Sequence, residues 1–393
     1  MRSGKTEKRE VRLSAEQPLT GRLRGDWRDL FAGFVIALDV RKLVLALTGA
    51  ILVFLFVFLP APWIALKYKP DMSAELGERG PAGYFVMVPD AIRVIYSQPC
   101  HVAFWWTCAA LLIGTAIWSL FGGAISRIAA VEIAKEDRIR TQEALSFAWR
   151  KWGSNFSSLV ACVLGFVFFS SLIAVVALPG RIPGAGPWLA LLPALLMPVL
   201  FVLGFIASLI GLGTVFGFPL FYPAVAAEGT DAFDAISRGF SYIYSRPWHA
   251  LAYTVVMLVH GAISTAFIYA FGLGMLAVTC LPIRAGMGPK FDHVLDFALC
   301  RISYADLVTA GGTGLGWSAI LITSWLLLLS GLTLAYALSY LQSQLTMIYF
   351  LLRQRVDELP MTYVYEEHPE EEESAKPGAG EKAAETAKDG EAK

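Results

Sequence analysis

The chain has 393 residues, of which 56% are apolar and 16% are charged, and its mean hydropathy is +0.57. These values exclude an ordinary soluble domain, in which about 25% of residues are charged, and they predict an integral membrane protein. The formal net charge is zero, but the charges are sorted by position: the first 42 residues hold ten Lys and Arg, whereas the residues after Val356 hold twelve acids against four lysines.

Six apolar runs are each long enough to cross a bilayer, which takes about 20 residues. They cover approximately residues 43–65, 102–125, 156–178, 191–218, 250–280 and 317–341. We therefore predict an all-α, polytopic membrane helix bundle of about six transmembrane helices over 43–352, between a basic N-terminal segment, 1–42, and a tail, 353–393. The fourth run contains several prolines, so one kinked helix and a re-entrant hairpin both remain open.

The distribution of basic residues predicts the orientation of the spans. Twenty Lys and Arg fall in 1–42, 127–151, 223–249 and the start of the tail, against eight in the intervening loops. By the positive-inside rule this predicts that both termini lie in the cytoplasm. From Glu366 onward the tail is acidic and has few apolar residues. We expect it to be disordered, as a solvated extension or as a docking segment for a basic partner.

Two amphipathic segments, 142–152 and 232–245, each precede an apolar run, and we call them elbows. Their apolar stripes and nearby basic residues predict interfacial helices that bind anionic lipid. EALSFAW at Glu143–Trp149 matches DAISRGF at Asp234–Phe240, and Thr230 is the expected N-cap of the second helix.

A weaker match relates Ile95–His101 to Ile243–His249, although these two segments would lie on opposite faces of the membrane. Tandem duplication of an elbow and its span, inverted duplication and chance similarity all remain open.

Three stretches carry a resemblance to a known group of proteins: Trp118–Ala134, Ala226–Trp248 and Ile348–Tyr365. They resemble uncharacterised multipass inner-membrane proteins of the planctomycete type. The resemblance implies a six-span or similar multi-pass architecture in the bacterial inner (cytoplasmic) membrane. It implies no activity, and no functional residues can be transferred from it.

Two candidate sites follow from the polar residues. Charges concentrated beside the second elbow predict a cytoplasmic contact surface formed by Glu228, Asp231, Asp234, Arg238 and Arg246. His260 is the one ionisable residue inside the predicted spans. It is either a structural histidine bonded to a hydroxyl or carbonyl group, or part of an intramembrane polar site.

The remaining motifs favour structural roles. The glycines between Gly204 and Gly217 predict close helix packing, and GGTGLG at Gly311–Gly316 predicts a flexible linker. The five cysteines show no zinc or redox spacing, although Cys280 and Cys300 could form a disulfide on an oxidising face.

Because the spans contain no nameable acid–base pair, nucleophile or metal-ligand set, we expect no enzymatic activity, cofactor or metal. The basic residues do not form a groove interleaved with aromatic residues, so we also expect no nucleic-acid partner. The leading hypothesis is a non-enzymatic scaffold or accessory subunit that contacts membrane lipids and a cytoplasmic protein. The alternative is a transporter or channel component with a midplane cavity near His260.

Overall fold

The computed structural model of the chain describes residues 23–71, 88–98, 100–184, 186–299, 301–302 and 304–366. All regular elements within these ranges are helices. Six of the helical segments are long and apolar enough to cross a membrane, which confirms the predicted all-α class and six-span count. These segments are Val40–Leu66, His101–Lys135, Trp152–Arg181, Met197–Glu228, Pro247–Met287 and Asp306–Val356.

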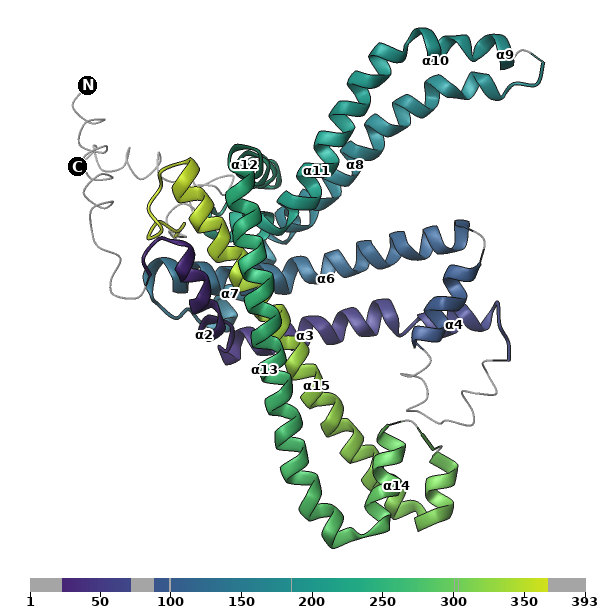
Figure 1. Ribbon diagram of the computed structural model, residues 1–393, viewed down its shortest axis with the longest axis vertical. Coiled ribbons are helices and arrows are strands. Elements are labelled where there is room, and N and C mark those ends of the chain that lie inside the picture. Colours follow the sequence, from purple (N-terminus) through teal and green to yellow (C-terminus); the bar gives the residue numbers. More distant parts are fainter. Residues whose placement is uncertain are drawn as a thin grey trace, which may run out of the picture.

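The long helices form three consecutive hairpins (Figure 1). Hairpin 1 pairs α6 (Cys100–Lys135) with α3 (Val40–Val53), which continues through the π-turn η2 (Phe54–Phe58) into α4 (Ala61–Leu66). Hairpin 2 pairs α8 (Trp152–Ala177) with α11 (Met197–Glu228). Hairpin 3 pairs α13 (Pro247–Met287) with α15 (Tyr304–Val356). The three hairpins meet at one end and diverge toward their tips.

The end at which the hairpins meet forms a region that we call the head. It contains the helix ends and four further pieces: η1 (Trp27–Ala32) with α2 (Gly33–Ala37), α7 (Thr141–Arg150), α12 (Ala232–Ser245), and residues 357–366. The described parts of the segments predicted to share the cytoplasmic face, which lie within 23–42, 127–151, 223–249 and 353–366, are therefore together at this one end of the molecule (Figure 1).

A short helical segment in the head precedes each hairpin: η1 with α2, then α7, then α12. The matching elbow sequences on α7 and α12 thus occupy equivalent places. The helix at 88–97 lies instead at the far end of hairpin 1, where Ala91 and Ile95 pack against Ala61 and Ala65 of α4. This arrangement fits a tandem series of elbow and hairpin units.

Helix boundaries in the head follow from local sequence. Asp231, not the expected Thr230, is the N-cap of α12, because its Oδ1 accepts a hydrogen bond from the backbone N–H of Asp234 at 2.9 Å. Gly229 ends α11 with a φ of +63°, a left-handed conformation that glycine adopts without steric cost. Pro247 begins α13, where its missing N–H is harmless.

Most of the fourth apolar run lies in one helix, α11, which begins at Met197, and the first five residues of the run form a separate short helix. α11 continues through Pro219 and Pro223 without ending, and the short helices α9 (Gly186–Leu189) and α10 (Leu191–Leu195) precede it. The region therefore contributes one span, a helix that continues through two prolines, and it does not form a re-entrant hairpin.

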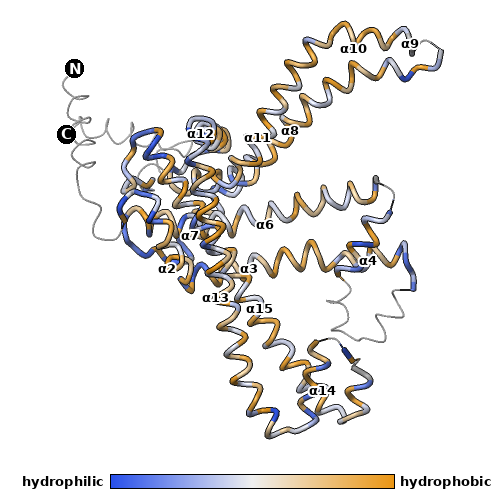
Figure 2. Tube along the Cα trace, in the orientation of Figure 1, coloured by the Kyte–Doolittle hydropathy of each residue, from blue (hydrophilic) through white to orange (hydrophobic). Residues whose placement is uncertain are grey.

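The buried core lies mainly in the head, where the ends of α6, α11 and α15 pack with α12. Away from the head, the hairpins are largely apolar (Figure 2), and few of their apolar side chains are buried. The extreme case is α13, whose most apolar 18-residue window has no buried residue. Exposed apolar helix faces of this extent suit a lipid environment.

Small residues in α11 allow the second elbow to pack closely. A Cβ added at Gly213 would lie 2.7 Å from the ring of Phe240, and one at Gly217 would lie 3.2 Å from it. The expected use of these glycines in helix packing is therefore observed. The segment Gly311–Gly316, in contrast, belongs to α15, which is interrupted at Gly312, and packs near α14 (Pro289–Ala298) instead of forming a linker.

Candidate functional site

Glu228, at the C-terminal end of α11, is the centre of a charge cluster in the head. Its side chain is 7% exposed. Arg238 Nη1 of α12 lies 2.6 Å from its Oε2, and Arg353 Nη1 of α15 lies 3.6 Å from its Oε1. The hydroxyl of Tyr349 donates to the same Oε1 at 2.5 Å. Glu228 therefore joins three helices from two hairpins and an elbow.

Arg238 extends the cluster to two further carboxylates. Its Nε donates to Asp234 Oδ2 at 3.0 Å, and its Nη1 lies 3.7 Å from Asp357 Oδ2. The Tyr242 hydroxyl donates to that same Asp357 oxygen at 2.5 Å. One guanidinium thus holds the start of the C-terminal segment against α12.

The electrostatics of α12 reflect these contacts. Burial lowers the pKa of Arg238, but the hydrogen bond that it donates to Asp234 and the charge of Glu228 outweigh burial, so the net pKa lies above its usual value. Burial and the interaction with Asp357 both raise the pKa of the Tyr242 hydroxyl. At neutral pH, Arg238 is therefore charged and Tyr242 is a neutral donor.

Residues 357–366 form what we call the strap, which crosses the head after α15. Arg353 is fully buried and donates from Nη2 to the carbonyls of Pro360 at 3.1 Å and Tyr363 at 2.8 Å. From α6, Arg127 Nη2 donates to the carbonyl of Tyr365 at 2.8 Å. The strap is thereby fixed by two arginines from different hairpins.

The far end of the strap also contacts α11 directly. The backbone N–H of Tyr365 donates to the carbonyl of Ala227 at 2.8 Å, and Arg127 Nη1 donates to the carbonyl of Ala226 at 2.8 Å. The Tyr365 ring covers Gly229, where an added Cβ would approach it to 2.5 Å. These contacts satisfy carbonyls at the end of α11 that have no partner within the helix.

A second buried ion pair closes the base of hairpin 1. The Lys42 side chain is fully buried, and its Nζ lies 2.6 Å from Glu132 Oε2 of α6 and 3.0 Å from the carbonyl oxygen of Ile36. The head is therefore joined by charged contacts at hairpin 1 as well as at the Glu228 cluster.

The five residues predicted as a contact surface separate into two groups. Glu228, Asp234 and Arg238 come together in the internal cluster described above. Asp231 caps α12, and Arg246 lies exposed between α12 and α13. The sequence reasoning missed five participants, Arg127, Tyr242, Tyr349, Arg353 and Asp357. Their one available signal was the presence of charged and hydroxyl groups inside or next to apolar helix ends.

His260 has local partners on neighbouring elements. Its Nδ1 lies 2.9 Å from the Tyr340 hydroxyl of α15, and its ring packs edge-on against Phe31 of η1 at a centroid distance of 5.2 Å. This placement matches the structural reading of the histidine, in which a hydroxyl satisfies a ring nitrogen.

Each of the three short helical segments that precede a hairpin has an exposed tryptophan and an exposed arginine within it or directly after it. These are Trp27 with Arg28 in η1, Trp149 with Arg150 in α7, and Arg246 with Trp248 at the start of α13. The three indole-bearing residues are 47%, 70% and 79% exposed. Tryptophan and arginine together are typical of the boundary between apolar membrane and anionic headgroups.

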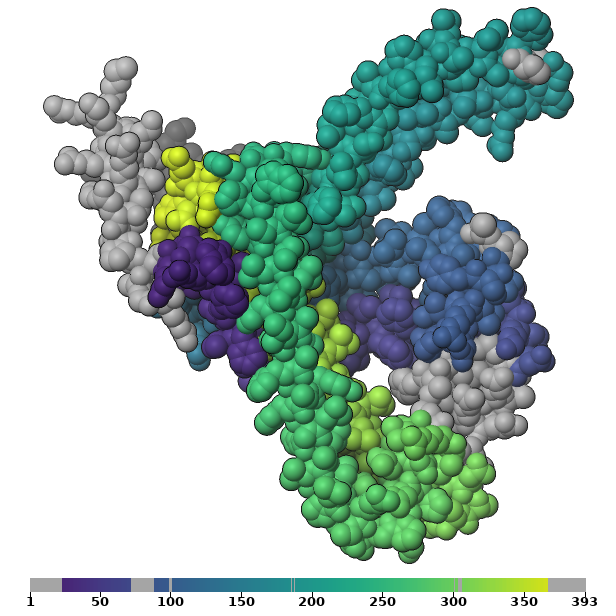
Figure 3. Space-filling view, viewed as in Figure 1, coloured from purple at the N-terminus to yellow at the C-terminus, as the bar shows by residue number. Residues whose placement is uncertain are grey.

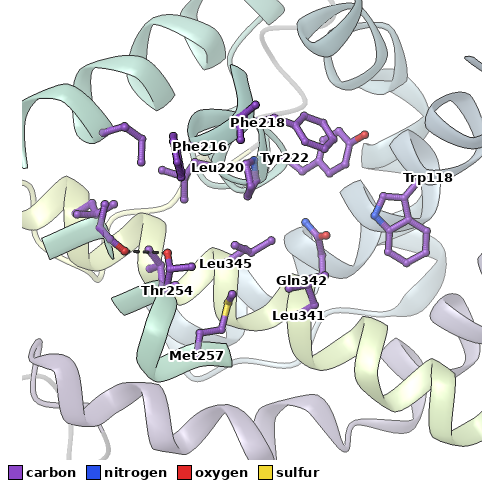
Figure 4. Close-up of a pocket in the computed structure, with 16 residues that line it drawn as sticks. Trp118, Phe216, Phe218, Leu220, Tyr222, Thr254, Met257, Leu341, Gln342 and Leu345 are labelled. Carbon is purple, nitrogen blue, oxygen red and sulfur yellow. Dashed lines mark hydrogen bonds between the residues drawn. The ribbon is translucent and has the colours of Figure 1, made fainter. Parts of the chain in front are cut away.

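An apolar cavity of about 270 Å³ lies where the hairpins meet (Figure 4). Its walls come from α6, α11, α12, α13 and α15, and include Trp118, Phe216, Ile243, Met257 and Leu345. His260 is not among the residues that line it.

Two expectations concern metal and disulfide chemistry. Within the described residues no group of three or more His, Cys, Asp or Glu could hold a metal ion. Cys280 has a free thiol, and Cys300 lies outside the described residues.

Comparisons with protein-family models, with curated proteins and with solved structures found no match.

Proposed function

We propose that the protein is a non-enzymatic membrane scaffold or accessory subunit, whose head contacts anionic lipid and a cytoplasmic partner while its hairpins offer apolar faces within the bilayer. One observation carries the proposal: among the described residues the three hairpins meet at the head and diverge from it (Figure 3), and each of them exposes large apolar side chains along its length. Such faces are available to lipid and to the helices of another membrane protein.

The lipid part of the proposal is supported by the arginine and tryptophan pairs at the three short helical segments that precede the hairpins. Each Arg near an anionic surface contributes about 1 kcal/mol of attraction. Replacing Arg28, Arg150 and Arg246 together by Gln is expected to reduce phosphatidylglycerol enrichment in native nanodiscs several-fold.

The hairpin tips offer a matched control for that variant. Arg93, Arg181 and Arg284 each lie at the far end of one hairpin. Replacing these three by Gln removes the same charge from the opposite end and is expected to leave the enrichment unchanged. Equal effects of the two triple variants would contradict an anionic-lipid role specific to the head.

The partner part is tested by photo-cross-linking in native membranes. A photoreactive residue at exposed Ser237 of the head, or at exposed Phe201 on hairpin 2, is expected to give discrete protein adducts. The same residue at buried Ala227 is the control. Absence of protein adducts at every exposed position would overturn the scaffold proposal.

The alternative, a transporter or channel component with a cavity near His260, has less support. The His260 ring nitrogen is already bonded to Tyr340, and the ring packs against Phe31. Substrate flux in proteoliposomes that is lost in His260→Ala would favour this alternative over the scaffold.

A further inference from the structure

The cavity at the junction of the hairpins is an apolar space open to the membrane. Its volume of about 270 Å³ is slightly below the ~300–1,000 Å³ of typical small-molecule sites, which suits a slender occupant. Two of its lining residues, Val215 and Phe216 of α11, are themselves 69% and 54% exposed. The cavity is therefore continuous with the apolar outer face of hairpin 2.

Hydrogen bonds within the protein already engage polar groups of the cavity wall. The Gln342 amide nitrogen donates to Ser126 Oγ at 2.6 Å. The Thr254 hydroxyl donates to the carbonyl of Ala250 at 2.8 Å (Figure 4). The Tyr222 hydroxyl lies 3.4 Å from Ser119 Oγ. With these donors engaged, the wall favours a hydrocarbon over a polar solute.

Arg246 lies close in sequence to two residues of the cavity wall. Arg246 separates α12 from α13, three residues after Ile243 and four before Ala250, and both of these neighbours line the cavity. Its side chain is exposed, and exposed Trp248 follows it. A phosphate at Arg246 would thus be within one helical turn of the cavity wall.

We infer that this cavity binds one acyl chain of an anionic phospholipid, whose phosphate lies at Arg246. The inference rests on the membrane and lipid contact of the proposed function and assigns it to a defined site. A lipid bound here would fill the angle between hairpins 2 and 3, because both α11 and α13 contribute to the wall.

The test uses the full chain purified in detergent from membranes that contain phosphatidylglycerol, with bound lipid counted by native mass spectrometry. Ala250→Phe fills the cavity from α13 and is expected to lower the retained phosphatidylglycerol at least tenfold. Ala266→Phe places the same ring on an exposed position of the same helix and is expected to retain the wild-type amount. Arg246→Gln is expected to keep a lipid but lose the preference for phosphatidylglycerol over phosphatidylcholine.

A second measurement does not depend on a cavity-filling variant. In single-tryptophan proteins, phosphatidylglycerol brominated on its chains is expected to quench Trp118 of the cavity wall even after dilution into lipid-free detergent. It is expected not to quench exposed Trp105 of the same helix under those conditions. Equal quenching of the two, or equal lipid retention by Ala250→Phe and Ala266→Phe, would overturn the inference. A failure of the scaffold proposal would instead appear as absent protein adducts, with lipid retention unaffected.

Discussion

At the scale of single residues, Glu228 is the acid on which the head depends most. Glu228→Gln leaves Arg353 buried without a negative partner, and breaking a buried ion pair in this way costs about 3 kcal/mol. We expect a clear fall in the thermal unfolding temperature in detergent.

The control for that variant is a pair on the surface. Asp292→Asn breaks the contact with Arg284. The side chain of Asp292 is 42% exposed and that of Arg284 is 62% exposed. Exposed ion pairs contribute about 0–1 kcal/mol, so the midpoint is expected to stay nearly unchanged. Similar shifts for Glu228→Gln and Asp292→Asn would contradict a stabilising role for the cluster.

Asp39 predicts a dependence of stability on pH. Burial raises its pKa, but hydrogen bonds and charge from Arg41 outweigh burial, so the net pKa lies below its usual value. The folded protein then binds fewer protons at Asp39 than the unfolded chain. Its contribution is present above an unfolded pKa of about 3.9 and is lost as the pH falls through the folded pKa.

The measurement compares the wild type with Asp39→Asn, which retains an N-cap side chain but cannot ionise. We expect the difference in unfolding temperature to be largest near neutral pH and to shrink as the pH falls below about 4. A difference that is constant across this range would show that the charge of Asp39 does not contribute.

At the scale of elements, the contact between α11 and α12 depends on missing side chains. Gly213→Ala places a methyl group 2.7 Å from the Phe240 ring and is expected to destabilise the protein by about 1–3 kcal/mol. Gly204→Ala in the same helix meets only Ile173, at 3.9 Å, and is expected to be neutral or stabilising because alanine favours helices. Thermal unfolding of both variants checks the prediction, and equal effects would contradict it.

The strap predicts a sharp boundary between dispensable and structural residues in the C-terminal part of the chain. Deletion of 367–393 leaves every described strap contact in place, and we expect no change in the unfolding temperature. Deletion of 357–393 removes the acceptors of Arg353 and Arg127 and the Asp357 contacts of α12, so we expect strong destabilisation. Equal stability of the two truncated proteins would show that the strap does not hold the head together.

At the scale of the whole molecule, the tips of the hairpins should move relative to one another while the head remains fixed. Regions with few buried apolar contacts open with little free energy, and the tips have far fewer than the head. In a cysteine-free background, we expect a broad spin-label distance distribution between positions 188 and 287 at the tips. We expect a narrow one between positions 146 and 237 in the head, and a narrow distribution at the tips would contradict this picture.

The sequence allowed the spans and elbows to be predicted because their signals are local. Apolar length gave six spans, and helical periodicity gave the elbows that became α7 and α12. The buried roles of Arg127 and Arg353 could not be read in the same way. Each lies at the polar end of an apolar run, where an arginine is ordinarily solvated. Arg127 binds a carbonyl 238 residues away, and Arg353 binds carbonyls of the irregular strap that follows its own helix.

The candidate contact surface shows the same limit. Charge density around Glu228 was visible in the sequence, but its partners Tyr349 and Arg353 lie more than a hundred residues further along the chain. Proximity in sequence therefore identified the charges without identifying which of them face one another.

The strap has a consequence for the order of biosynthesis. The carbonyl of Tyr365 that Arg127 binds is synthesised 238 residues after that arginine, when all three hairpins have already been made. Each hairpin can enter the membrane as a separate pair of helices, but the head reaches its final form only when the strap emerges from the ribosome. Completion of the head is therefore a post-insertion step. A chain truncated before the strap would leave three inserted hairpins without the strap contacts that join them.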